Sequence, residues 1–415
     1  MKRKEASATA ALQPGGEKSP HGCLKHHMGE EYDKAASLNG LFKSSHKCLD
    51  GVQHKDGPME FTTTCFSSCG KLRKDLLTGK YKIWQGTKVK ISRPKPRVAT
   101  APWFKDRVWQ RSMVDNGVYR DLTDGFLFTN MACQKGKGPD LAIRTIIQML
   151  QELHRENPNG EIWGDHLDIR KYFPSTPQRE IIEMDERKIR DKAFLPYLRE
   201  IATSETDPRS AEEIAADPFG KRGTGLGSQI NQLHQIALLN DLDHEAASKC
   251  PHYLRYNDDF LILSNDKETI KETKALIEQR LREKGLTPQD KGGIFKTSDG
   301  FYFMRKRFIV KPSGKIIIRL HPKALKEERN ALRGMKERLD AGEIDINHVK
   351  RHYQSWVANA SYAGDGPLRE MDRFYTQLFR QKPEYKLKRR YLYGNRCDKQ
   401  GKNQNIGKRK PESQE

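Results

Sequence analysis

Apolar positions recur at helical spacing over long stretches of the chain. The clearest case is GPDLAIRTIIQMLQELHREN, where residues 141, 143, 146, 147 and 150 are apolar and an Asn closes the run. Similar spacing is found in EEYDKAASLNGLFK, CGKLRKDLLTGKY and FKDRVWQRSMVDNGVYRDL. It returns in INQLHQIALLNDLDHEAASK, which follows the Gly-rich loop GKRGTGLGSQ. The pattern therefore predicts a chain rich in amphipathic helices.

Strand-like segments lie in the middle of the chain. EIWGDHLDIRKYFPS predicts a short strand that ends in a turn at Pro174. YLRYNDDFLIL predicts two strands joined by a tight turn, and GFYFMRKRFIVKPSGKIIIRL predicts strands joined by a turn at PSGK. Helical spacing dominates again after residue 322. We expect an α+β middle followed by an all-helical carboxy-terminal part.

Three other segments lack such patterns. Residues 1–30 carry Gly, Pro and Ser without periodicity, so we expect them to be disordered. Residues 383–415 form a basic, sparsely apolar and flexible tail, either a tether for RNA or a solubilising end. In TKVKISRPKPRVATAP the prolines exclude a helix and favour extended basic structure.

Asp258 and Asp259 interrupt a strand pattern with two adjacent like charges. Strands are depleted in Asp, and Asn and Asp are ordinary turn residues. A hairpin turn alone would therefore account for the pair. The alternative is that the turn holds both carboxylates so that they bind a divalent cation.

The charge of the chain predicts polyanionic partners. Over 415 residues the formal net charge is +21, and the pI is near 9.5. Such an excess favours attraction to nucleic acid. No apolar run approaches a membrane span, and the amino terminus, MKRKEASATAALQPGG, lacks the apolar core of a secretory signal. We expect a soluble cytoplasmic protein without a membrane partner.

The seven cysteines are scattered and odd in number. In a large chain of this kind we expect reduced thiols. CFSSC could supply half of a zinc site with the histidines between residues 21 and 46. Its spacing also fits one face of a helix, and no second closely spaced pair completes a site. We therefore favour thiols over zinc.

A third carboxylate changes the interpretation of the Asp pair. Asp168 ends the strand predicted around LDIRKYF, and two strand ends that converge in an antiparallel sheet would bring it to Asp258 and Asp259. Three carboxylates repel one another, and without cations one would be protonated. Two Mg²⁺ ions, with Mn²⁺ as a substitute, relieve the repulsion and stabilise the attacking and leaving oxygens of a phosphoryl displacement. The set predicts two-metal nucleotidyl transfer.

These segments together resemble a known family. Four of them, in this order, resemble motifs A, B, C and E of reverse transcriptases: LDIRKYF, GLGSQINQ, YNDD and GFYFMRKRF. Two upstream segments look like the family's fingers motifs: RPKPRVATAPWFKDRVWQRSM and NMACQKGKGPDLAI. The resemblance covers roughly residues 30–380. It implies an RNA-directed DNA polymerase, which uses an RNA template, a DNA or RNA primer, and dNTPs.

The resemblance also implies an α+β fold of the right-hand polymerase type. Its fingers and palm, an antiparallel sheet with helices, would precede an α-helical thumb. We expect fingers and palm in residues 31–300, primer-grip strands in residues 301–322 and the helical thumb in residues 323–382.

Roles are carried over by position within the motifs. Asp168 and Asp258 would bind both catalytic metals with help from the main-chain carbonyl of Ile169, and Asp259 would complete the cluster. Phe173 matches the family's steric gate, an aromatic ring that clashes with a ribose 2′-OH and selects deoxynucleotides. Ordinary core packing is the alternative for Phe173.

Positive charge is needed where the leaving pyrophosphate develops its charge. Arg97, Lys135 and Lys137 are the candidates, and solvated surface positions are the alternative. Family members commonly carry an Arg where this chain has Gln134, so either the neighbouring lysines compensate or triphosphate binding is weaker. Lys291 occupies the place of the motif D lysine that could protonate the pyrophosphate.

LGSQINQ separates lineages within the family. Group II intron enzymes carry Gln-Gly here, whereas those of diversity-generating retroelements resemble Ile/Val/Leu-Gly-x-x-x-Ser-Gln. Leu226, Gly227 and Gln232 match the second pattern, while Asn231 replaces its Ser. This loop would lie beside the nascent base pair, and a Leu in place of an amide predicts lower fidelity, with errors at template adenines. The chain is most like the diversity-generating lineage.

Other interpretations stay open. Neither an RNase H-like domain nor a maturase-type extension is apparent, so we expect an accessory RNA-binding protein or a structured RNA to supply template choice and priming. The chain could be a defence-associated or group II intron-like bacterial reverse transcriptase. It could also be a non-catalytic RNA-binding protein with a polymerase-like fold. Phe173 disfavours an RNA-dependent RNA polymerase.

Overall fold

The computed structural model describes residues 29–84, 86–91 and 97–385. Contacts divide the chain into two compact units, each built from three stretches of sequence. Unit 1 takes Met1–Cys133, Ile169–Glu245 and Glu278–Gln289, and unit 2 takes Gln134–Asp168, Ala246–Ile277 and Asp290–Glu415. The predicted boundaries at residues 300 and 322 stay predictions. The disordered segment and the flexible tail expected at the two ends lie, except for residues 29–30 and 383–385, outside the described residues.

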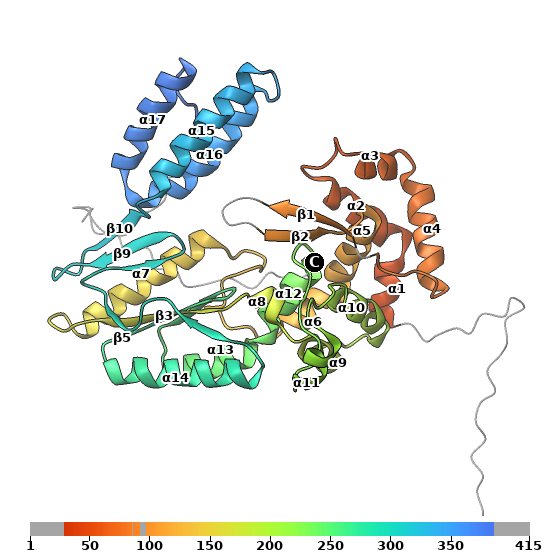
Figure 1. The fold of residues 1–415 in the computed structure, drawn as a ribbon, viewed down its shortest axis with the longest axis horizontal. Helices are drawn as coiled ribbons and strands as arrows, with labels where there is room; N and C mark the ends of the chain where they lie inside the picture. Colours follow the sequence, from red (N-terminus) through yellow and green to blue (C-terminus); the bar gives the residue numbers. More distant parts are fainter. Residues whose placement is uncertain (1–28, 85, 92–96, 386–415) are drawn as a thin grey trace, which may run out of the picture. The chain divides into compact units, whose positions relative to one another are not determined.

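Unit 1 is mainly helical (Figure 1). Its first stretch contains α1 Glu30–Ala36, α2 Leu38–Leu49, α3 Asp56–Thr63, α4 Cys65–Leu77, β1 Thr87–Ile91, β2 Arg97–Ala101, α5 Phe104–Met113, a π-helical turn Val114–Val118 and α6 Tyr119–Thr123. Its second stretch contains α8 Tyr172–Ser175, α9 Gln178–Lys188, a 3-10 turn Lys192–Phe194, α10 Leu195–Ala202, α11 Ala211–Ala216 and α12 Gln229–Leu238. The strands β1 and β2 form an antiparallel hairpin, which confirms the extended structure predicted there.

Aromatic rings from three helices form the centre of unit 1. Tyr32 of α1, Trp109 of α5 and Tyr197 of α10 are all buried. The ring centroid of Trp109 lies 5.5 Å from that of Tyr32 and 5.4 Å from that of Tyr197, both at edge-to-face angles. This is a favourable geometry for aromatic pairs. It fixes α1 against a helix far away in sequence.

A five-stranded sheet in the order β4-β5-β3-β6, with β7 paired to β3, has β4, β5, β7 and all of β3 except Ile169 in unit 2. The strands are β3 Trp163–Ile169, β4 Tyr253–Tyr256, β5 Asp259–Ser264, β6 Pro288–Asp290 and β7 Phe295–Lys296. The helices next to it in sequence are α7 Pro139–Glu156, α13 Asn240–Lys249 and α14 Lys267–Glu283. Figure 1 shows α7 on one side of the sheet and α14 on the other. Covering on both sides explains why four successive residues of β5, Phe260 to Leu263, are buried.

A second sheet and a helical bundle complete unit 2. The sheet has the order β10-β9-β8, with β8 Phe301–Phe303, β9 Lys306–Val310 and β10 Ile316–Leu320. The helices are α15 Ala324–Asp340, α16 Ile346–Ala360 and α17 Asp365–Phe379, with a 3-10 turn Ser361–Ala363. The sequence predicted one turn in the sheet, whereas the structure adds a second at Met304 and Arg305, both of which have positive φ.

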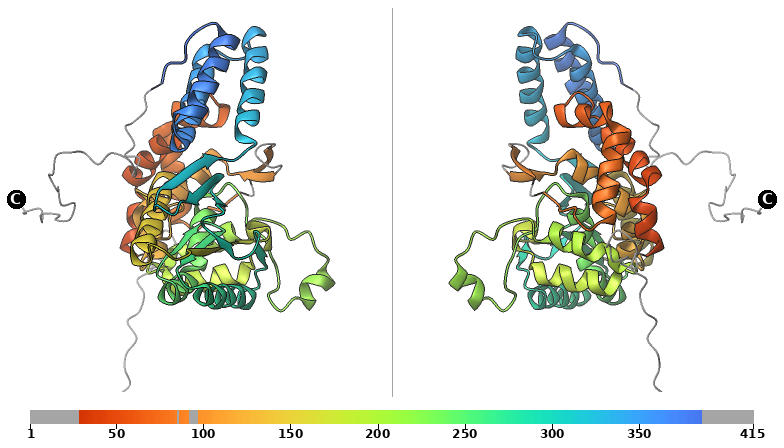
Figure 2. Two further views of the ribbon diagram at one scale, coloured as in Figure 1. Left: turned by 90° about the vertical axis from the view of Figure 1, so that its left-hand side faces the viewer. Right: turned by 90° about the vertical axis from the view of Figure 1, so that its right-hand side faces the viewer.

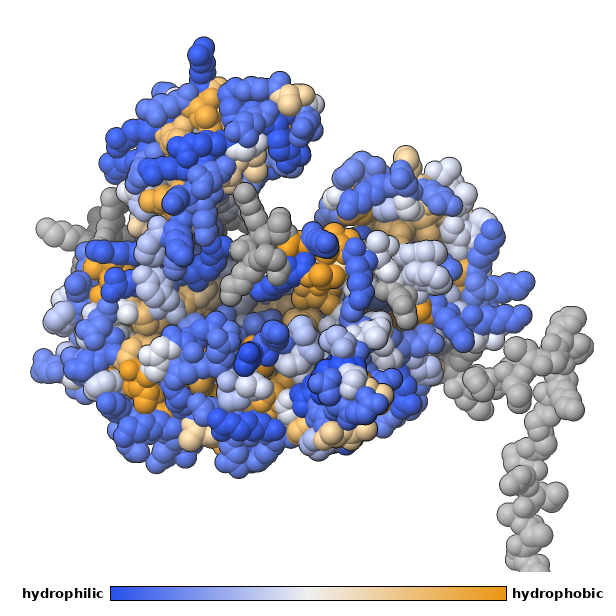
Figure 3. Space-filling model, viewed as in Figure 1, coloured by the Kyte–Doolittle hydropathy of each residue, from blue (hydrophilic) through white to orange (hydrophobic). Residues whose placement is uncertain are grey.

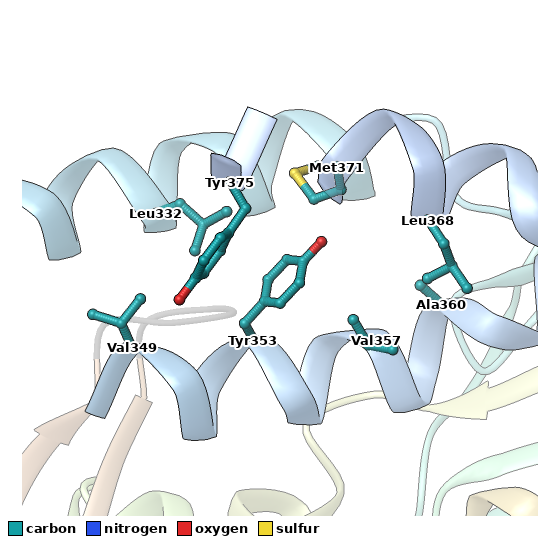
Figure 4. Packing of buried hydrophobic residues seen from close by; sticks show 8 residues of the cluster. All are labelled: Leu332, Val349, Tyr353, Val357, Ala360, Leu368, Met371 and Tyr375. Atoms are coloured by element: carbon teal, nitrogen blue, oxygen red, sulfur yellow. The ribbon is translucent and has the colours of Figure 1, made fainter. Parts of the chain in front are cut away.

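The three helices α15, α16 and α17 lie side by side (Figures 1 and 2). Their core is a cluster of buried side chains shown in Figure 4, which includes Leu332, Tyr353, Met371 and Tyr375. The Tyr353 hydroxyl donates to Asp372 Oδ1 at 2.7 Å, so its polar end is satisfied. The outer surface of these helices is mostly hydrophilic in Figure 3. An all-helical part after the strands is confirmed.

Two local predictions differ from the structure. The segment after β3 is a helical turn, α8, and Pro174 lies inside its first turn, where its missing N–H leaves no broken bond. The long helix predicted after the Gly-rich loop is two helices, α12 and α13, because the backbone leaves helical geometry at Leu239. No helix among the described residues is both long and apolar enough to cross a membrane.

Candidate active site

The adjacent aspartates lie in a tight hairpin of unit 2. Tyr256 of β4 pairs with Asp259 of β5, which leaves Asn257 and Asp258 as the two turn residues. Asn257 has φ 61°, a left-handed conformation that Asn tolerates better than most residues. The guanidinium of the fully buried Arg255 donates to the Asn257 carbonyl at 2.9 Å. The predicted hairpin is confirmed, and it fixes Asp258 at the turn.

Asp168 reaches the same place from β3. This strand pairs antiparallel with β5, from Trp163 opposite Ser264 to Leu167 opposite Phe260. One further step in this register puts Asp168 opposite Asp259. Side chains alternate across a strand, so Asp168 shares a face of the sheet with His166.

The three carboxylates interact electrostatically. Burial raises the pKa of Asp258 to about 6, and the charges of Asp168 and Asp259 add to the effect. A carboxyl group in such surroundings resists ionisation because nearby negative charge and low polarity both oppose it. The structure therefore concentrates negative charge where the sequence predicted a carboxylate cluster.

Two cationic or polar partners flank this cluster. Lys291 Nζ lies 2.5 Å from Asp168 Oδ2, and the main-chain N–H of Lys291 donates to the His166 carbonyl at 3.1 Å. Burial lowers the pKa of Lys291, but the bond to Asp168 and the charges of the three aspartates outweigh burial and raise it. His166 Nε2 lies 3.0 Å from Asp259 Oδ1. The His166 ring also packs edge-to-face on Phe303 at 5.1 Å.

A charge network that runs from buried Asp165 to exposed Asp290 supports the loop that carries Lys291. The Asp290 carboxylate accepts from the N–H groups of Gly292 and Gly293 at 3.0 and 2.6 Å. Lys274 of α14 pairs with Asp290 and also with Asp165, which is fully buried in β3, at 2.9 Å. Sequence reasoning missed Lys274, Asp165, Asp290 and His166.

The carboxylate oxygens of Asp168, Asp258 and Asp259 are of the chemical type that binds a hard divalent cation. Carboxylate oxygens are the ligands that Mg²⁺ prefers. Burial and then repulsion raise the pKa of Asp258, and a cation would relieve the repulsion. The side chains, however, are engaged with Lys291 and His166. Within the part of the chain that the structure describes, no group of three or more His, Cys, Asp or Glu side chains is arranged to hold a metal ion. A cation at Asp168 would compete with the Lys291 ammonium.

The predicted nucleotide-binding residues fall in both units. Phe173 lies in α8, and Arg97 is the exposed first residue of β2, both in unit 1. Lys135 and Lys137 lie in the turn before α7, in unit 2 with the carboxylates and Lys291. Of these predicted residues, Lys291 forms an ion pair with an aspartate of the cluster, Asp168.

Leu226 and Gly227 lie in the loop before α12 in unit 1. The Leu226 carbonyl accepts from the N–H of Thr100 at 2.7 Å. Gly227 has φ 123°, and a Cβ there would lie 2.4 Å from the Thr100 carbonyl oxygen. The close approach of this loop to β2 requires Gly at position 227.

The CFSSC segment, with Cys65 and Cys69, lies in α4 of unit 1. Burial and the neighbouring Cys65 raise the pKa of Cys69 to about 12. Cys48, Cys65, Cys69 and Cys250 are free thiols, as expected. The histidines of residues 21–27 lie outside the described residues.

No protein-family model matches this sequence, and no curated protein matches it. Among solved structures, the chain is similar to apo telomerase from Candida tropicalis truncated from its C-terminal domain, at 12% identity and a TM-score of 0.36 over 60% of this chain. It is also similar to telomerase from Candida albicans in complex with a TWJ fragment of telomeric RNA, at 10% identity and a TM-score of 0.40 over 72% of this chain. The matches span 60% and 62% of the length of those chains. At these scores the likenesses assign neither a family nor an activity to this chain.

Proposed function

We propose that this chain is an RNA-directed DNA polymerase that extends a DNA or RNA primer with dNTPs on an RNA template. The observation that carries the proposal is the convergence of Asp168 with the Asp258–Asp259 hairpin through the pairing of β3 with β5. Burial and the charges of Asp168 and Asp259 raise the pKa of Asp258, which accords with it. Gathering carboxylates in partly buried positions is costly unless a cation is to be bound there. The ordered reverse-transcriptase motifs around the same residues support the assignment.

In this proposal Asp168 and Asp258, with the main-chain carbonyl of Ile169, hold two Mg²⁺ or Mn²⁺ ions, and Asp259 completes the set. When bound, the ions supply charge stabilisation at the attacking and leaving oxygens. The pairing of β3 with β5 orients the carboxylates, and His166 holds Asp259. Lys291 Nζ is the group we assign as proton donor to the leaving pyrophosphate.

The nucleotide site is assigned from the motifs. Arg97, Lys135 and Lys137 would bind the triphosphate, and the partly exposed ring of Phe173 would exclude a ribose 2′-OH. Leu226 and Gly227 would lie beside the nascent base pair. The LGSQINQ segment favours the diversity-generating type, which implies an accessory RNA-binding protein as partner. The cytoplasmic location stays a prediction.

A second candidate is a non-catalytic RNA-binding protein with a polymerase-like fold. The ion pair between Lys291 and Asp168 favours it, since an ammonium already neutralises one of the carboxylates. The net charge of +21 suits either function.

Primer extension on an RNA template with Mg²⁺ and dNTPs tests the proposal, with wild type beside Asp258→Ala/Asp259→Ala. We expect DNA synthesis from the wild type and none from the variant. Sequenced products with errors concentrated at template adenines would support the diversity-generating type, and evenly spread errors another bacterial lineage. A wild type that binds RNA but makes no DNA, alone or with cell-derived RNA and proteins, would favour the second candidate.

A further inference from the structure

Gln235 is a fully buried polar residue of α12 that none of the assigned roles uses. Its side-chain Nε2 donates to Thr224 Oγ1 at 2.6 Å, and its Oε1 accepts from Thr176 Oγ1 at 3.0 Å. Its main-chain carbonyl accepts from the Tyr172 hydroxyl at 2.6 Å. A buried amide left without partners would cost stability, and here both ends of the amide are bonded.

Two bonding partners of Gln235 lie before and after Phe173 in the sequence, and the third bonds to its carbonyl. Tyr172 precedes Phe173 in α8, and Thr176 follows that helix. Across from them, the main-chain N–H of Thr224 donates to the Phe173 carbonyl at 3.0 Å. Gln235 therefore links the backbone that carries the Phe173 ring to the Gly-rich loop that faces it.

The Phe173 ring is held by a backbone that is bonded on both sides and by one aromatic contact. Phe173 is only partly buried, and its ring lies edge-on to that of Tyr172 at 6.2 Å. The bond from Thr224 to the Phe173 carbonyl therefore contributes to the position of the ring. A steric gate acts over distances of about 1 Å, so a small displacement of the ring changes what it excludes.

We propose that Gln235 is a positioning residue that holds the Phe173 ring through Thr224 and Thr176 and so sets the preference for deoxynucleotides over ribonucleotides. The proposal rests on the polymerase function proposed above. It gives Gln235 no contact with substrate, and it places the determinant of sugar selection partly in the core of unit 1.

The test measures incorporation of one dNTP and of the matching rNTP on a primed RNA template, as the ratio of their kcat/KM values. Gln235→Met keeps the length of the side chain and removes its hydrogen bonds, and Thr224→Val removes the hydroxyl that Gln235 reaches, which itself donates to the Phe173 carbonyl at 3.4 Å. Phe173→Ala is the reference for a lost gate. Gln279→Met is the matched control, since Gln279 is an exposed helical Gln bonded only within its own helix, to Glu283 at 2.8 Å.

We expect Gln235→Met to lower the dNTP preference by about tenfold, because part of the free energy of the two lost hydrogen bonds reaches the Phe173 ring. Thr224→Val should lower it similarly, and the double variant should lower it no further than the larger single effect, because both changes break one chain of contacts. Gln279→Met should match the wild type. Thermal melting of each variant verifies folding, and Thr224→Val replaces Gln235→Met if the latter does not fold.

An unchanged preference in Gln235→Met and Thr224→Val, with preference lost in Phe173→Ala, would overturn the positioning role and leave the polymerase standing. Additive effects of the two changes would also overturn it, because they would show independent structural contributions. A wild type without any DNA synthesis would overturn the polymerase and the positioning role together.

Discussion

Burial and the neighbouring carboxylates Asp168 and Asp259 disfavour the ionised form of Asp258. Its pKa rises from 3.8 to about 6, so the folded chain holds this proton more tightly than the unfolded chain does. Stability therefore falls as the pH rises from 3.8 to about 6, and the full penalty remains above it. The shift corresponds to about 3 kcal/mol, which contact with solvent reduces.

Asp258→Asn should therefore stabilise the metal-free protein while it abolishes DNA synthesis. We expect a gain of about 1–2 kcal/mol near neutral pH, and a smaller gain as the pH falls through about 6 toward about 4. Urea unfolding in EDTA at several pH values measures it. Asp299→Asn, at an exposed position of the same unit, should change stability by less than about 0.5 kcal/mol. Equal stability of wild type and Asp258→Asn near neutral pH would contradict the clustering of charge.

Lys291 and a divalent cation should compete for Asp168. A ligand that binds only the folded state raises its melting temperature according to its affinity. Lys291→Met removes the ammonium from Asp168, so Mg²⁺ should raise the melting temperature of this variant more than that of the wild type. The same variant should make DNA more slowly, since it lacks the assigned proton donor. Asp168→Asn/Asp258→Asn is the control, and Mg²⁺ should leave its melting temperature unchanged.

At the scale of elements, the sheet and α14 are joined by the buried pair Lys274–Asp165. Removing one partner of a buried pair leaves the other charge uncompensated and costs about 3–5 kcal/mol. Lys274→Met should therefore destabilise the protein by about this amount, and more strongly at higher pH, because burial already raises the pKa of Asp165. Chemical unfolding measures the loss. Asp165→Asn added to Lys274→Met should recover much of it, and a loss that this second change leaves untouched would point to packing.

The same elements show what the sequence could and could not predict. The strand that ends at Asp168 and the turn at Asp258 follow from local signals, whereas their convergence followed only from the expectation that both strands share one antiparallel sheet. His166 lies two residues before Asp168, and its shared face could have been inferred from the same alternation. The role of Lys274 could not be predicted from the sequence, because its partners are set by the packing of a helix on a sheet. The end of α12 at Leu239 could not be predicted, since the apolar spacing of the sequence continues across it.

At the scale of the whole molecule, the charge of +21 over 415 residues should govern RNA binding. Binding through phosphate contacts releases counterions, so the affinity falls steeply with salt. For about six to ten contacts the loss is roughly 10³-fold or more between about 50 and 200 mM salt. Filter binding or fluorescence anisotropy with a labelled RNA measures the slope, and a flat response would contradict binding through charge.

The carboxylate variant is the control for the salt series, because it separates RNA binding from DNA synthesis. Asp258→Ala/Asp259→Ala removes negative charge from the site and none of the lysines or arginines, so its affinity for RNA should equal or exceed that of the wild type, with the same slope. DNA synthesis should be lost in this variant alone. Affinity lost together with synthesis would mean that the variant is misfolded or that the carboxylates shape the RNA site. Retained affinity without synthesis separates binding, a property of the whole charged surface, from catalysis at three aspartates.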